Sequence, residues 1–204
     1  MKLFTEKSQI NKFIPKNALL ENTKASPSTI TTFNEDIKKI RIINQLSPST
    51  IHIDEGKAIK SIFFIEVELK HKEYRKSSIQ LLDKLINQSK IMVLTFENEY
   101  KIVVNKVNLI ESKWSSKEEI YLQIEGLNLD KVYENFIRKI GNIEAEENKN
   151  IEDQIKQKEE KDKLIKQIQR LEKQAYKETQ PRKKFELKKE IDSLKQKIED
   201  NIHG

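Results

Sequence analysis

The chain of 204 residues contains no cysteine, and it has only four glycines, four prolines and three histidines. The absence of cysteine excludes disulfides, thiolate zinc sites and thiol nucleophiles. Four scattered glycines do not make a glycine-rich phosphate loop, so we expect no nucleotide hydrolysis by this chain. His52, His71 and His203 lie far apart, and we expect neither a metal cluster nor a cofactor.

Long apolar runs are also missing. No stretch approaches the roughly 18 to 20 residues that a bilayer crossing needs, and the N-terminus has no apolar signal region. We therefore expect a soluble, cytoplasmic protein without a membrane partner. The 39 basic residues nearly balance the 33 acidic ones, and the net charge is +6. Such a charge permits nucleic-acid binding but does not require it.

The segment from Ser61 to Leu94 organises the first part of the chain. An apolar run at Ile62–Lys70 predicts a strand, and a second run at Ile91–Leu94 predicts another. An amphipathic helix capped by Ser77 or Ser78 is expected between them, which makes a right-handed parallel βαβ unit. Side chains alternate along a strand, so Phe63, Ile65, Val67 and Leu69 share one face while Glu66, Glu68 and Lys70 share the other.

The flanking segments predict further helices and strands. Residues 1–26 are expected to form an arm with one helical turn near Pro15. Ser26-Pro27 is a helix start signal, and the helix that it begins is expected to reach Ser47-Pro48. Its predicted buried stripe is Ile30, Phe33, Ile37, Ile40 and Ile43. A short strand is expected at Ile51 and Ile53.

The remainder of the domain predicts a hairpin and a closing helix. Residues 91–97 and 100–107 read as its two strands, and another strand is expected at 120–125. A helix capped by Asp130 follows and ends at Gly141. We therefore predict an α/β or α+β domain over residues 1–141, with a small mixed sheet and flanking helices.

Residues 142–204 form a charged helical linker and tail. Two heptad stripes occur in it: Leu164, Ile168, Leu171, Ala175 and then Leu187, Ile191, Leu194, Ile198. At about 100° per residue the second stripe is about 160° out of phase with the first, so one straight helix would hold them on opposite sides. A turn near Thr179–Pro181 lets them face each other, and we favour such an antiparallel helical hairpin, or coiled-coil tail.

One group of residues resembles a nuclease site. Glu68 and Lys70 form a Glu-x-Lys triplet, with Asp54 upstream. In nucleases of the restriction-endonuclease-like class, an upstream acid and such a triplet bind a divalent metal that activates water. The alternative is a strand whose end emerges into water, where Glu and Lys are ordinary residues. The second interpretation is favoured in so highly charged a chain.

Other residues are candidates for binding. Trp114 is either a lid on the core edge or an interface anchor. Arg182, Lys183 and Lys184 form a basic cluster that could contact phosphates, but nearby glutamates favour a solvated helix face. The predicted partner-binding residues are Trp114 and the tail stripes without Ala175: Leu164, Ile168, Leu171, Leu187, Ile191, Leu194 and Ile198.

Several stretches together resemble a bacterial domain-of-unknown-function family, DUF4391. They are INKFIPK at Ile10–Lys16, the run from IRIINQLSPSTIHI into SIFFIEVELK and LLDKLI, IEGLNLDKVYENFIRKI at Ile124–Ile140, and RLEKQAYKETQPRKKFELKKEI in the tail. The resemblance implies bacterial loci with helicase-like ATPases and DNA methylases that defend against phage, and it assigns no catalytic residues.

These observations together predict a non-catalytic subunit of a bacterial DNA-processing or anti-phage complex. Its tail is expected to dock a helicase-like ATPase or a DNA methylase, and contact with nucleic acid is expected to be weak. The alternative is a metal-dependent nuclease that uses Asp54, Glu68 and Lys70 with a divalent cation.

Overall fold

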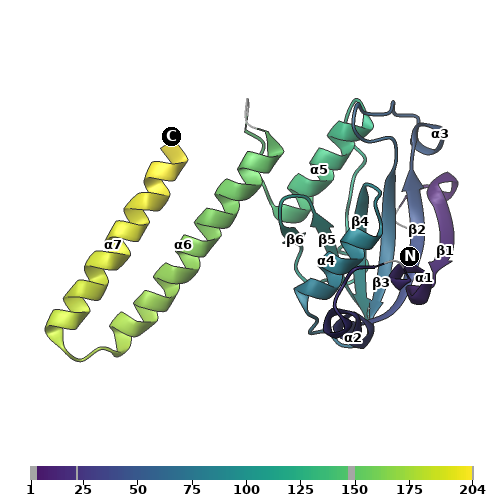
Figure 1. The fold of residues 1–204 in the computed structure, drawn as a ribbon. Helices are drawn as coiled ribbons and strands as arrows, with labels where there is room; N and C mark the ends of the chain where they lie inside the picture. The colour runs from purple at the N-terminus through teal and green to yellow at the C-terminus, as the bar shows by residue number, and fades with distance from the viewer. Residues whose placement is uncertain (1–3, 22, 147–149, 204) are drawn as a thin grey trace. The chain divides into compact units, whose positions relative to one another are not determined.

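The structure is a computed structural model that describes residues 4–21, 23–146 and 150–203. The chain divides into two compact units, residues 1–145 and 146–204. The first unit contains the sheet and the second is a pair of helices (Figure 1).

The first unit begins with a strand that was not predicted. A short 3-10 turn, η1 (Glu6–Ser8), leads into β1 (Gln9–Ile14), which pairs antiparallel with β2 (Ile37–Leu46). The helical turn expected near Pro15 is α1 (Lys16–Leu20). The N-terminal segment therefore extends the sheet as its edge strand.

The long helix predicted after Pro27 is wrong beyond its first half. Helix α2 (Pro27–Asp36) begins as expected, and the Ser26 side chain accepts a hydrogen bond from Thr29 N at 3.2 Å. Residues 37–46 are strand β2 instead of its continuation.

Bulges in β2 explain the helix-like spacing of its isoleucines. Ile37 pairs with Leu69 and Ile40 with Val67, and the register shifts between these two pairs. The partners are two residues apart while the isoleucines are three apart, because a bulge adds one residue to one strand. A spacing of three, which normally indicates a helix, is therefore produced here by a strand.

The strand expected at Ile51 and Ile53 is also wrong. Residues 48–51 form a short helix, α3 (Pro48–Ile51), whose Thr50 Oγ1 accepts a hydrogen bond from Ser47 N at 2.9 Å. His52 ends this helix with a φ of 56°. Such a left-handed residue terminates a helix, so the chain turns away before Ile53.

The central βαβ unit is confirmed. Strands β3 (Ile62–Leu69) and β4 (Lys90–Phe96) are parallel, and α4 (Lys76–Leu85) connects them. The helix starts after Arg75, so neither Ser77 nor Ser78 is its cap. Ser78 is buried and bonded to another element, as described below.

The hairpin after β4 is confirmed, but the strand predicted at 120–125 is wrong. Strand β5 (Glu99–Asn105) pairs with β4, and β6 (Leu109–Glu111) pairs with β5. Strand β6 occupies the edge of β5 next to residues 103–105, and residues 120–125 run as irregular chain outside the sheet. The described strands form one mixed sheet in the order β1-β2-β3-β4-β5-β6.

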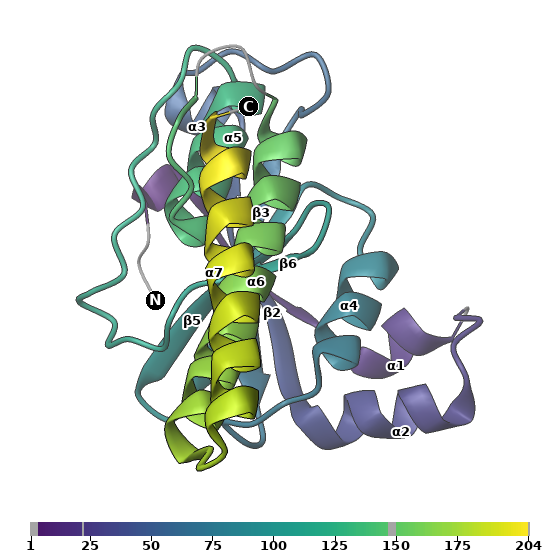
Figure 2. The ribbon, with the colours of Figure 1, turned by 90° about the vertical axis from the view of Figure 1, so that its left-hand side faces the viewer.

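Helices cover both faces of this sheet. On one face α2 and α4 lie side by side (Figure 2), and Phe33 and Leu82 pack with Ile65 and Met92 of the strands. On the other face lies α5 (Leu129–Gly141). The rings of Phe64 and Phe136 meet there edge to face, with centroids 5.6 Å apart.

The prediction that Asp130 caps α5 is wrong. Asn128 occupies the cap position, and its side chain accepts a hydrogen bond from Lys131 N at 3.1 Å. The Asp130 carboxylate instead accepts hydrogen bonds from the backbone amides of residues 57–59, the nearest at 2.8 Å. A Cβ on Gly56 would lie 2.1 Å from Asp130 Oδ1, so only glycine fits beside this carboxylate. Asp130 thus fastens the loop before β3 to the start of α5.

The second unit is the predicted helical hairpin. Helix α6 (Ile151–Lys177) and helix α7 (Pro181–His203) run antiparallel around a turn at residues 178–180 (Figure 1). Proline at the first position of α7 lacks the amide hydrogen that a helix interior needs, so it starts a new helix there. Asn150 caps α6 by accepting from Asp153 N at 2.9 Å.

Candidate functional site

The carboxyl ends of parallel strands are where α/β sheets commonly bind ligands. In this fold β3 and β4 end together, at Leu69 and Phe96. We call this end of the sheet the carboxyl edge. Two of the three residues of the nuclease hypothesis, Glu68 and Lys70, lie at it.

The third residue, Asp54, lies near the opposite end of β3. It forms a parallel bridge with Asn128, at the start of α5. Helix α5 starts at the end of the sheet where β3 begins (Figure 1). The strand from Ile62 to Glu68 extends about 20 Å at the usual rise per residue. The structure therefore does not bring Asp54 together with Glu68 and Lys70.

The acid that reaches the carboxyl edge is Asp36, which the sequence analysis missed. It is the last residue of α2, it is 4% exposed, and its carbonyl oxygen accepts from Lys70 N at 2.9 Å. Its carboxylate accepts from Ser78 Oγ at 2.6 Å and from Arg75 N at 3.0 Å. Asp36 thus supplies the N-terminal cap that α4 lacks in its own sequence.

The two glutamates of β3 are held in ion pairs. Glu68 is 2.6 Å from Lys38 Nζ, and Glu66 is 3.5 Å from Arg41 Nε. Strand alternation places both glutamates on the face opposite to α4, away from the Asp36 carboxylate. In the described residues no three histidine, aspartate or glutamate side chains are grouped as metal ligands would be. The carboxyl edge is therefore organised as a network of ion pairs.

Trp114 lies on the core covered by α2 and α4, where it is half-buried. Lys101 Nζ lies 5.1 Å from the centroid of its ring and 5.6 Å from that of Tyr74. Burial, and secondly the Glu111 carboxylate, raise the pKa of Tyr74, so this phenol stays protonated at neutral pH. The arrangement supports the interpretation of Trp114 as a lid on the core edge.

A buried ion pair links α4 to the sheet. Lys90 Nζ lies 2.7 Å from Asp83 Oδ1 and donates to the carbonyl of Ile86 at 2.7 Å. Asn105 donates to Asp83 Oδ2 at 2.7 Å, and Tyr133 donates to the Lys90 carbonyl at 3.1 Å. Each charged group has protein partners, as buried charges require. We assign this network to holding the helix on the sheet.

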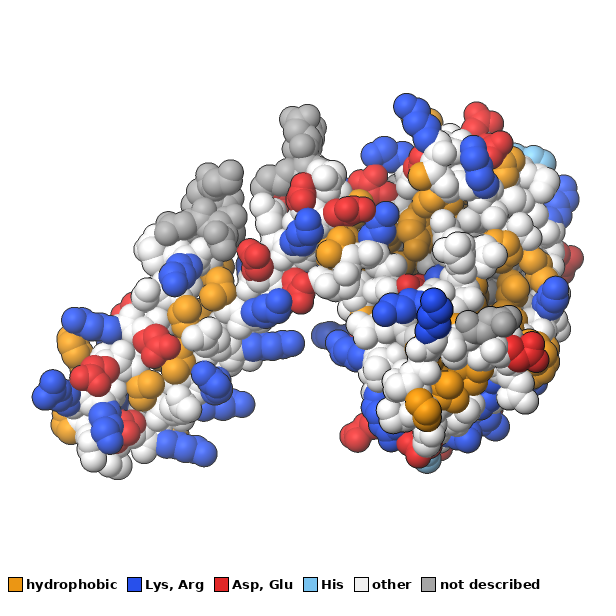
Figure 3. Space-filling model, viewed as in Figure 1, with side chains coloured by type: hydrophobic (Ala, Val, Ile, Leu, Met, Phe, Trp, Pro, Cys, Tyr) orange, Lys and Arg blue, Asp and Glu red, His pale blue; other side chains and the backbone are white. Residues whose placement is uncertain are grey.

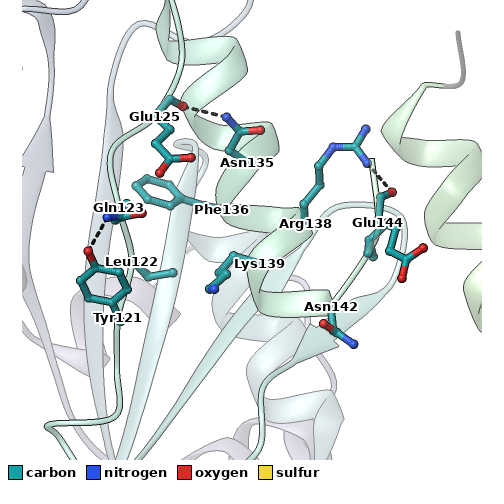
Figure 4. A pocket seen from close by; sticks show the side chains of 11 residues that line it. Tyr121, Leu122, Gln123, Glu125, Asn135, Phe136, Arg138, Lys139, Asn142 and Glu144 are labelled. Carbon is teal, nitrogen blue, oxygen red and sulfur yellow. Dashed lines mark hydrogen bonds between the residues drawn. The ribbon is translucent and has the colours of Figure 1, made fainter. Parts of the chain in front are cut away.

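A shallow pocket of about 290 Å³ lies between residues 121–125 and α5 (Figure 4). Asn135 donates to the Glu125 carbonyl at 2.8 Å, and Gln123 donates to the Tyr121 hydroxyl. At its other end Arg138 donates to the Glu144 carbonyl at 3.0 Å and pairs with Glu134. The bond from Asn135 to Glu125 ties the irregular segment to α5, and Arg138 holds the chain that follows this helix.

The hairpin uses its apolar stripes internally. Ile168 and Leu171 of α6 are buried against Ile191 and Leu194 of α7, and Leu164, Ala175, Leu187 and Ile198 pack around them. We call this contact the seam. The leucines and isoleucines predicted to bind a partner therefore bind the other helix of the hairpin.

The exposed apolar surface of the hairpin lies near its turn. Tyr176 is 88% exposed and Phe185 is 59% exposed. They line a groove of about 570 Å³, whose other lining residues are Glu172, Ala175, Pro181, Lys184, Lys188 and Ile191. We call it the tip groove. The seven-residue spacing of the stripes predicted the seam residues. Tyr176 and Phe185 lie outside that spacing, so it did not predict them.

The predicted basic cluster is divided between different sides of α7. Lys184 lines the tip groove, while Lys183 lines a polar hollow with Glu178, Glu186 and Glu190. Arg182 Nε is 3.5 Å from Glu186 Oε1. Figure 3 shows acidic and basic side chains mixed over the visible face of the hairpin. The cluster does not form a continuous cationic surface.

None of the helices in the described residues combines the length and the apolar character that a bilayer crossing requires. No curated protein and no solved structure matches the chain. The family described as "Domain of unknown function (DUF4391)" matches residues 5–198, nearly the whole length. The chain therefore belongs to the DUF4391 family.

Proposed function

We propose that this protein is a non-catalytic subunit of a bacterial DNA-processing or anti-phage defence complex, and that its helical hairpin docks the partner. The observation that carries the proposal is the pair of exposed aromatic residues, Tyr176 and Phe185, on a hairpin whose seam is already filled. Aromatic residues are enriched at protein interfaces, where they bury large areas. The family resemblance suggests a helicase-like ATPase or a DNA methylase as the partner.

The non-catalytic part of the proposal is supported by the state of the polar side chains. The acids near the carboxyl edge are paired with Lys38 and Arg41, and Asp36 caps α4. A nuclease that uses Asp54, Glu68 and Lys70 has less support, since Asp54 is bridged to Asn128.

Co-purification from the native host tests the proposal. Tagged full-length chain is expected to bring down an ATPase or a DNA methylase, and a chain without residues 160–204 is expected to lose it. Circular dichroism of the shortened chain checks that the first unit stays folded. Retention of the partner by the shortened chain would show that the hairpin is not the docking element.

A matched control uses an exposed aromatic residue of the first unit. Tyr121 is 63% exposed and is not part of the hairpin. Tyr121→Ala removes a comparable exposed ring, so under the proposal it leaves co-purification unchanged. If it abolishes co-purification as completely as the deletion does, the docking surface lies in the first unit and the proposal fails.

A further inference from the structure

The tip groove has a chemical character that specifies its occupant. We propose that it binds an acidic amphipathic helix of the partner, an inference that rests on the docking role proposed above. Its floor is formed by Ala175, Tyr176, Pro181, Phe185 and Ile191. Lys184 and Lys188 line it from α7 and have no ion pair within the described residues.

The spacing of the groove residues fits a helix as ligand. Each of Pro181, Lys184, Phe185, Lys188 and Ile191 lies three or four positions from another member of the set, so they form a continuous strip along α7. The ten residue steps from Pro181 to Ile191 extend about 15 Å at the helical rise. A partner helix of two to three turns would cover this strip, as in other helix-in-groove complexes.

The charge of the surrounding surface indicates which charge the bound partner helix should carry. Between residues 170 and 190, eight lysines and arginines stand against four glutamates. Two of these glutamates are engaged within the chain: Glu172 lies 2.9 Å from Lys195 Nζ and Glu186 lies 3.5 Å from Arg182 Nε. The cations at the groove are therefore left for an external anion, and carboxylates flanking the apolar face of the ligand would supply it.

The two sides of the hairpin tip differ in this respect. The hollow lined by Lys177, Lys183 and Leu187 contains three glutamates, at positions 178, 186 and 190, that offset its lysines. It also lacks an exposed aromatic residue. The side with Tyr176 and Phe185 thus has both the apolar floor and the unpaired cations.

A second copy of this chain fits the groove less well. A symmetric dimer brings the same patch of both copies together, so Lys184 and Lys188 would approach the lysines of the other copy. Like charges at contact distance oppose association. An acidic ligand has the opposite effect, because it neutralises both side chains.

Fluorescence anisotropy with the full-length chain tests the inference. The probe is a labelled helical peptide of about 20 residues with leucines on one face and glutamates beside them. Its control has the same leucines and lysine in place of each glutamate. The acidic probe is expected to bind at least about tenfold more tightly than the basic one, with an affinity that falls as salt is added.

Variants locate the binding on the groove. Phe185→Ala is expected to weaken the acidic probe by about tenfold or more. The double variant Lys184→Glu/Lys188→Glu is expected to reverse the preference between the two probes, so that the basic probe binds more tightly than the acidic one. Lys183→Glu, on the other side of the tip, is the matched control and should leave the preference as it is.

Several results would overturn the inference. They are equal binding of the two probes, unchanged binding after Phe185→Ala, and self-association of the chain that this substitution abolishes. Tighter binding of an oligonucleotide through the same residues would assign the groove to nucleic acid instead. If co-purification requires residues 160–204 but not Phe185, Lys184 or Lys188, the docking role stands and this inference falls.

Discussion

Two carboxylates, those of Asp36 and Asp130, each hold together segments of the first unit that lie far apart in the sequence. Asp36 ends one helix and caps another through Ser78 and Arg75. Asp130 lies in α5 and holds the backbone amides of residues 57–59. In each case one acid satisfies amide hydrogens that the local chain leaves unbonded. Such residues read as ordinary surface acids in the sequence because their partners are more than thirty positions away.

Replacement of Asp130 by asparagine is expected to lower the free energy of unfolding of the first unit by on the order of 1 kcal/mol at neutral pH. Asparagine keeps one side-chain oxygen but removes the charge that receives three amides. Urea denaturation followed by tryptophan fluorescence measures the difference. Gly56→Ala should be destabilising for the same reason, because its methyl group displaces the carboxylate.

The effect of Asp130→Asn is expected to depend on pH. Desolvation raises the pKa of Asp130, but the three backbone hydrogen bonds and Lys60 together outweigh it, and the net pKa lies below the ordinary value. The carboxylate therefore stabilises the fold above about pH 4, and this contribution is lost as the pH falls through the lowered pKa. The two proteins should converge in stability once the pH is below the lowered pKa. A difference that persists unchanged there would contradict the role of the charge.

At the scale of elements, sequence patterns were reliable where periodicity was undisturbed. The parallel strands β3 and β4, helix α5 and the hairpin all follow from regular spacing of apolar residues. The prediction from apolar spacing failed at β2, where a bulge gives Ile37 and Ile40 the spacing of a helix. The prediction failed again at residues 120–125, which alternate like a strand but lie outside the sheet. Whether a segment pairs as a strand depends on where the other strands lie, and the spacing of apolar residues carries no information about that.

The seam is the element whose loss should be easiest to measure. Leu171 is 4% exposed and packs in the seam, so Leu171→Ala is expected to cost about 2 to 5 kcal/mol. A two-helix hairpin has little stability to lose, and we expect it to open. Hydrogen exchange should accelerate across α6 and α7, and helical circular dichroism should fall.

Phe185→Ala is the control for this substitution. Phe185 lies outside the seam and is largely exposed, so its removal should leave the exchange rates of α6 and α7 unchanged. The amides of β3 and β4 should be protected in both variants, because the cores of the two units are separate. Equal acceleration in β3 and in α6 after Leu171→Ala would mean that the two units unfold together.

At the scale of the whole molecule, composition indicated the class of protein better than it indicated the site. The lack of cysteine excluded disulfides and thiol nucleophiles from composition alone. The Asp54 hypothesis depended on which end of β3 the upstream acid reaches, and sequence distance does not determine that. The tip groove was missed because Tyr176 and Phe185 belong to neither heptad stripe.

Weak DNA binding is the expectation for the molecule as a whole. Affinity for duplex DNA comes from cations that replace condensed counterions, at nearly one unit of log–log salt slope for each phosphate neutralised. Glutamates accompany the hairpin's cations within a Debye length of about 8 Å, and Arg182 already lies 3.5 Å from Glu186. Lys184 and Lys188 line the tip groove together, and two phosphate contacts of this kind give a slope of only about 2.

We therefore expect the full-length chain to bind duplex DNA without sequence preference, at dissociation constants of about 10⁻⁴ to 10⁻⁶ M at physiological salt. Anisotropy titrations at several salt concentrations measure both the affinity and the slope. Substitution of Arg182, Lys183 and Lys184 by alanine should change the affinity by less than about tenfold, because Arg182 lies 3.5 Å from Glu186 and Lys183 shares its hollow with three glutamates. Tight binding that collapses in this triple variant would make the hairpin a nucleic-acid arm, since no protein partner is needed to explain such a result.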